Sequence, residues 1–140
     1  MEITEKQLRL ILVALEDYFR LRMGQTYIDL VDDMCLQNIE LPEAGEERNR
    51  AFNEFIWRRD TARDILQEFY IACLGRDIKR HQKTPEMEIA IDMWSEIRHW
   101  LWEQRPVEQR GYGVDSYPVY QFGEEPLPRL ERRDHVSRDI

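Results

Sequence analysis

The sequence predicts an all-α fold: a four-helix, bundle-like single domain with an extended, irregular C-terminal tail. Glycine and proline, which interrupt helices, are absent from four long stretches: residues 1–23, 25–41, 46–74 and 86–105. Within each stretch apolar residues recur at intervals of three and four, which is the period of an amphipathic helix. We therefore expect a helical domain over residues 3–105 and a tail rich in proline, glycine and aromatic residues over residues 106–140.

The charge balance limits the kinds of partner. With 28 acidic and 20 basic residues, the 140-residue chain has a formal net charge of −8. Such a surface repels a phosphate backbone, so direct nucleic-acid binding is not expected, whereas a basic protein partner is compatible with it. The longest apolar run, residues 10–15, is too short to cross a membrane, and no signal-peptide pattern is present. We expect a cytoplasmic protein.

The first helix has clear ends. Thr4 and Gln7 have the spacing of a capping box, and Gly24 suits the left-handed residue that follows a helix. One face of this helix is apolar: Leu8, Ile11, Leu12, Leu15 and Phe19. The polar arc, formed by Arg9, Glu16, Asp17 and Arg20, covers only about a third of the circumference. The first helix is therefore predicted to be mostly buried.

The second helix is expected over about residues 26–38, and the third over about 46–74. A break of the third helix at Asp60–Thr61 stays open as an alternative, because these residues could cap a new helix. The third helix has an apolar face made of Ala51, Phe52, Phe55, Ala62, Leu66, Phe69 and Cys73. Cys35 and Cys73 lie among apolar residues of these helices and are interpreted as buried thiols.

The fourth helix begins with Thr84 as N-cap and Pro85 at the first helical position, and it ends before Pro106. Its inward side is predicted to carry Ala90, Met93, Trp94, Ile97 and Leu101. A polar strip on the opposite side is predicted to face water: Glu88, Asp92, Glu96, His99 and Glu103.

No motif in the sequence predicts a catalytic, cofactor or metal site. Glu96 and His99 have the Glu-x-x-His spacing of di-iron bundle proteins, but only one copy is present and it lies on the polar strip. Phosphate loops, nucleophile elbows and paired cysteines are also absent. The alternative is a small helical metal-carboxylate enzyme, such as a hydrolase, that uses Asp60, Asp64, Glu68, Glu96 and His99.

Several side chains do not fit a plain bundle. Arg59 interrupts the apolar face of the third helix, where it is interpreted as a structural ion pair or an edge residue, with a recognition arginine as the alternative. Trp57 lies opposite that face among charged residues. Trp102 shares a minor apolar stripe of the fourth helix with Met87 and Ile91. For both tryptophans, packing beneath the tail or loops and contact with a partner remain equal alternatives.

The tail is irregular but rich in large apolar groups, notably Tyr112, Tyr117, Tyr120 and Phe122. These side chains are expected to lie on the helical body or on a partner. Together with Trp57, Arg59, Trp102, Met87 and Ile91, they form the predicted partner-binding set. The function predicted from this surface is a non-enzymatic adaptor, regulator or inhibitor that binds another protein, with a homodimer also considered. A narrower version has the acidic surfaces imitate nucleic acid, as some phage-encoded inhibitors do.

Overall fold

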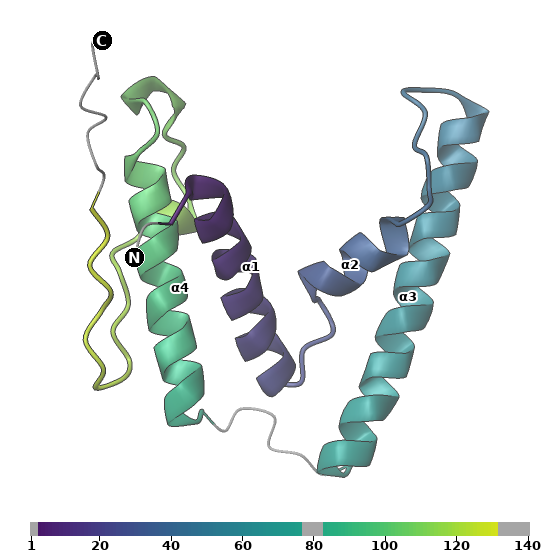
Figure 1. The fold of residues 1–140 in the computed structure, drawn as a ribbon. Coiled ribbons are helices and arrows are strands. Elements are labelled where there is room, and N and C mark those ends of the chain that lie inside the picture. The colour runs from purple at the N-terminus through teal and green to yellow at the C-terminus, as the bar shows by residue number, and fades with distance from the viewer. Residues whose placement is uncertain (1–2, 77–82, 132–140) are drawn as a thin grey trace.

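A computed structural model describes residues 3–76 and 83–131, and within them it confirms an all-α, bundle-like fold without strands. The described residues form the helices α1 (Glu5–Arg22), α2 (Asp29–Leu36), α3 (Glu46–Leu74) and α4 (Pro85–Glu103), which are labelled in Figure 1. Two short 3-10 turns follow in the tail, η1 (Val107–Gln109) and η2 (Val114–Ser116). The charged end of the tail, residues 130–140, is predicted to be flexible, and its residues 132–140 lie outside the described residues. No described helix is both long and apolar enough to cross a membrane.

The predicted helix ends are confirmed at most positions. The Thr4 hydroxyl accepts a hydrogen bond from the Gln7 amide at 3.1 Å, and the Gln7 side chain accepts one from the Thr4 amide at 2.8 Å. Gly24 and Gly75 have positive φ angles of 70° and 85°, which L side chains rarely adopt. The Thr84 hydroxyl caps α4. Helix α3 is continuous, so the alternative break at Asp60–Thr61 does not occur.

Helix α2 is shorter than predicted because its start depends on a distant residue. Ile28, at the N-cap position, is extended and has no side chain that can cap the helix. Instead, the buried Asp17 carboxylate of α1 accepts hydrogen bonds from the Asp29 and Leu30 amides, both at 3.0 Å. The first turn of α2 therefore begins where it meets Asp17, since these amides lack partners within the helix.

The helices pair into two limbs. Helix α1 packs along α4, and α2 packs on α3. In the first limb Leu8, Ile97 and Leu101 form a buried cluster, and the Phe19 and Trp94 rings meet edge to face with centroids 5.4 Å apart. In the second limb Tyr70 is the only buried residue of α3. We call these pairs the α1–α4 limb and the α2–α3 limb.

The two limbs diverge, and α3 makes no helix contact with α1 or α4 (Figure 1). They meet where α1 contacts α2 and where the Tyr70 hydroxyl donates a 2.6 Å hydrogen bond to the Gln25 carbonyl. As a result, α1 is covered on one side only, and Leu10 on its outer side is 71% exposed. The prediction that α1 is mostly buried was wrong, because no second helix covers that side. Cys73 is likewise exposed, whereas Cys35 is buried as predicted.

Candidate interaction surface

The tail folds back along α4 and covers the polar strip that the sequence analysis placed in water. Asp92, in the middle of this strip, is buried. Its carboxylate accepts hydrogen bonds from the Phe122 amide at 2.8 Å and the Gly123 amide at 2.9 Å. The Ser95 hydroxyl accepts another from the Tyr120 amide at 2.9 Å. The prediction of a solvated strip was therefore wrong at Asp92, because this carboxylate holds the tail.

The tail backbone lies close to α4 at Gly123. A Cβ atom at this position would lie 3.4 Å from an Asp92 carboxylate oxygen and 3.4 Å from the Glu88 Cβ. Both distances are at the short limit of ordinary van der Waals contact. Further along the tail, a cavity of about 220 Å³ lies between residues 89–93 of α4 and residues 125–128.

Trp102 is also covered by the tail. Its indole Nε1 donates a 2.9 Å hydrogen bond to the Gly111 carbonyl, and its ring stacks on His99 with centroids 5.4 Å apart. The Arg110 guanidinium lies 5.4 Å from the centre of the same ring. Met87, which was predicted to share a minor apolar stripe with Trp102, is only 1% exposed, and Ile91 is half-buried. In this structure, Met87 has no surface to offer a partner.

His99 has local partners in the tail and on its own helix. Its Nδ1 atom lies 3.0 Å from the Asp115 carbonyl oxygen, and its Nε2 atom lies 3.3 Å from the Glu103 carboxylate. Arg98 also forms an ion pair with Asp115. Within residues 3–76 and 83–131, no three His, Cys, Asp or Glu side chains gather closely enough to hold a metal ion.

The residues of the alternative metal-carboxylate site do not converge. Asp60, Asp64 and Glu68 lie on α3, whereas Glu96 and His99 lie on α4. These two helices belong to different limbs and do not contact each other.

The tail aromatics remain largely in solvent even though the backbone beside them is bound. Tyr112 is fully exposed, and Tyr117, Tyr120 and Phe122 are also exposed. The Tyr120 and Phe122 rings contact each other with centroids 5.5 Å apart, and the Lys83 ammonium lies 4.2 Å from the centre of the Phe122 ring. The tail thus binds α4 chiefly through backbone hydrogen bonds and presents aromatic side chains on its outer side.

The α2–α3 limb is held by polar contacts of arginines. Arg63 forms an ion pair with Asp32 at 3.2 Å, and its guanidinium lies 4.2 Å from the centre of the Tyr27 ring. Arg59 reaches its neighbour Asp60 at 3.1 Å and lies over the Phe55 ring. This placement of Arg59 matches its interpretation as a local ion pair at the edge of the apolar face.

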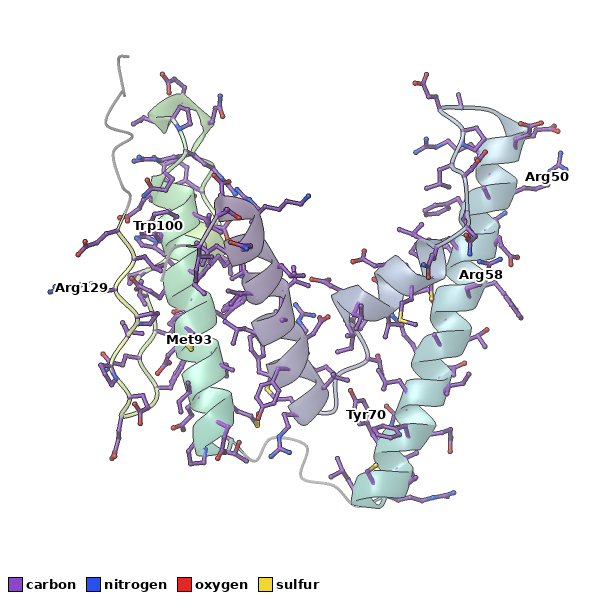
Figure 2. All side chains as sticks on the ribbon, in the orientation of Figure 1. Arg50, Arg58, Tyr70, Met93, Trp100 and Arg129 are labelled. Carbon is purple, nitrogen blue, oxygen red and sulfur yellow. The ribbon has the colours of Figure 1, made fainter. Side chains whose placement is uncertain are left out.

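Trp57 is the most exposed of the four tryptophans. Its side chain is 64% exposed, whereas Trp94, Trp100 and Trp102 are half-buried. Figure 2 shows the two limbs with their side chains. Arg58, the residue that follows Trp57, is labelled on α3, and Tyr70 lies nearer the lower end of the same helix. Other large apolar side chains of α3 are also exposed: Phe52, Ile65, Phe69 and Leu74.

Two ionisable groups are perturbed at the junction of the limbs. Burial raises the pKa of the Asp29 carboxyl above its ordinary value, and the nearby carboxylates of Glu16 and Asp17 raise it further. Burial also raises the pKa of the Tyr70 phenol. Both groups lie where α1, α2 and α3 approach one another.

The roles of Asp17, Asp92 and Ser95, which position α2 and the tail, were not predicted. Asp17 and Asp92 lie on the polar faces of their helices, and the amides that they bind lie twelve or more positions away in the sequence. The chain matches no protein-family model, and neither a curated protein nor a solved structure shows significant similarity to it.

Proposed function

We propose that this is a cytoplasmic, non-enzymatic protein that acts as an adaptor, regulator or inhibitor by binding another protein through the α2–α3 limb. The observation that carries the proposal is the exposure of α3. This helix has 29 residues and a single buried one, and Trp57 stands in solvent on it. Large exposed apolar patches are rare on proteins that act alone, and tryptophan is among the commonest anchors of protein interfaces.

The charges around Trp57 suit a partner with a mixed or basic surface. Glu54 and Arg58 form an ion pair at 2.9 Å beside it, and Asp64 lies two turns further along the same side of the helix. An apolar anchor within a polar rim is the usual organisation of a protein interface. The exposed tail aromatics Tyr112 and Tyr117 would form a second contact region on the α1–α4 limb.

Affinity capture from the native cell, with two matched variants, tests this proposal. Trp57→Ala removes the anchor, whereas Val107→Ala removes an apolar side chain that is 73% exposed in the tail. We expect Trp57→Ala to lose the captured partner, because truncation of an anchor costs about 2 kcal/mol or more, and Val107→Ala to retain it. The free energy of unfolding of both variants should lie within about 0.5 kcal/mol of the wild-type value. Equal capture by both variants would contradict the proposal.

A further inference from the structure

Helix α1 has a second apolar face that residues 3–76 and 83–131 leave exposed. Leu8 and Phe19 face α4, whereas the opposite side carries four exposed residues at helical spacing: Leu10, Ala14, Tyr18 and Leu21. We call these four residues the outer face of α1. A helix that is apolar on both sides is normally packed on both sides.

Helix α3 has an uncovered apolar face of similar size. Ala62, Ile65, Phe69 and Ala72 follow one another at intervals of three, four and three, so they lie on one side of the helix. Ile65 is 65% exposed and Phe69 is 57% exposed. We call these residues the open face of α3. Because α1 and α4 make no contact with α3, neither covers this face within one chain.

The two faces match in length and in the sizes of their side chains, and the helices that carry them have opposite net charges. At about 1.5 Å per residue, residues 10–21 and 62–72 span about 15–17 Å. Each face combines small alanines with large side chains, which allows the helices to interlock. Helix α1 carries four basic and three acidic residues, a net charge of +1, whereas α3 carries five basic and six acidic residues, a net charge of −1. These opposite net charges favour contact between the two helices.

The exposed area of the chain is large enough for a stable dimer. The whole chain of 17.1 kDa exposes 11308 Å², whereas a compact monomer of this mass exposes about 7,800 Å². If the 17 residues outside the described part had the area of an unfolded chain, about 3,000 Å², the other residues would still expose about 1,200 Å² more than the roughly 7,100 Å² of a compact monomer of their own mass. A standard interface buries about 800 Å² on each partner.

We propose that a second copy of this chain covers both faces. The outer face of α1 in each copy packs on the open face of α3 in the other copy, which gives two equivalent contacts related by a two-fold axis. In the dimer, the α2–α3 limb of each copy covers the outer face of α1 in the other copy, a face that is exposed in the single chain. The inference deepens the proposed function by naming one partner of the α2–α3 limb. Trp57 lies on a different side of α3 from the open face, so a foreign partner can still reach it.

Sedimentation velocity of the full chain over a range of concentrations tests the dimer. We expect the wild type to dimerise, and we expect Leu10→Glu and Phe69→Glu each to weaken dimerisation at least about 30-fold. Both positions are more than half exposed in the single chain, so the helical circular dichroism spectrum should be unchanged. Val107→Glu is the matched control, since Val107 is equally exposed but lies in the tail. This control should dimerise like the wild type.

A mixture of the two variants tests which faces meet. A mixed dimer of Leu10→Glu and Phe69→Glu has one contact between two unmodified faces, so mixing should restore association above that of either variant alone. A monomeric wild type, variants that dimerise normally, or a mixture that recovers nothing would each overturn the inference. A monomeric wild type that still captures a partner through Trp57 would overturn the dimer alone. A wild type that dimerises, but whose capture of a partner is unaffected by Trp57→Ala, would overturn the proposed function alone.

Discussion

Replacing Asp17 with alanine should destabilise the protein by removing the acceptor for the first turn of α2. The buried carboxylate accepts two backbone amides at 3.0 Å, and no other side chain caps this helix. Loss of a helix cap costs about 0.5–2 kcal/mol, and a hydrogen bond to a charged group contributes about 1.5–3 kcal/mol. The same substitution relieves repulsion between Asp17 and Asp29, the residue whose pKa is raised in part by Asp17. We therefore expect a loss near 2–3 kcal/mol rather than the sum of both bonds.

Urea unfolding followed by circular dichroism measures this change. Asp17→Asn keeps one acceptor oxygen and should lose about 1 kcal/mol, between wild type and Asp17→Ala. Asp33→Ala is the control, because Asp33 is an exposed acid of α2 without a hydrogen bond to the helix start, and it should lose less than about 0.5 kcal/mol. If Asp17→Ala and Asp33→Ala were equally stable, the capping role of Asp17 would be refuted.

Three further substitutions test the junction of the limbs and the tail. Tyr70→Phe should lose about 1 kcal/mol at neutral pH, because the Gln25 carbonyl loses its donor. Because burial raises the pKa of Tyr70 in the folded state, Tyr70 stabilises the fold below its unfolded pKa of about 10, and this stabilisation is lost as pH rises through the folded pKa. Urea unfolding above pH 10 should therefore show a smaller stability difference between wild type and Tyr70→Phe. A difference that stays constant with pH would contradict this. Asp92→Ala should abolish the hydrogen-exchange protection of the Phe122 and Gly123 amides, because both amides donate to the Asp92 carboxylate. Replacement of the exposed Glu86 by alanine should leave this protection intact. Protection that is retained in Asp92→Ala would show that another group holds the tail. Trp102→Ala should lower the unfolding free energy by about 2 kcal/mol, a value between those typical of surface and core residues, because the tail half-buries the Trp102 side chain. A loss below about 0.5 kcal/mol would assign Trp102 to a partner instead.

The sequence predicted most helix ends correctly, because the interactions that start and end these helices involve residues close together in the chain. The capping box of Thr4 and Gln7, the positive φ of Gly24 and the start of α4 at Pro85 each depend on residues within one turn. The start of α2 could not be predicted in this way, because its cap, Asp17, lies twelve residues earlier on another helix.

The pattern of apolar residues shows which faces need cover but not what covers them. Asp92 looked like a solvated residue because the tail segment that buries it is thirty positions away. The outer face of α1 looked buried because its composition is apolar, although Leu10 is exposed in the single chain. Among the predicted partner-binding residues, Trp57 and the tail tyrosines are accessible, whereas Met87 is enclosed. Periodicity could not separate these cases, since it contains no information on long-range pairing.

The central claim is that the α2–α3 limb presents Trp57 to solvent as an anchor, and acrylamide quenching of tryptophan fluorescence tests it most directly. The wild type should contain a red-shifted, readily quenched component, because Trp57 is 64% exposed while the other three tryptophans are half-buried. Trp57→Phe should remove this component and leave the less quenched emission of Trp94, Trp100 and Trp102. If the substitution left both the emission maximum and the quenching unchanged, Trp57 would be covered within the protein, and the proposed binding surface would not exist.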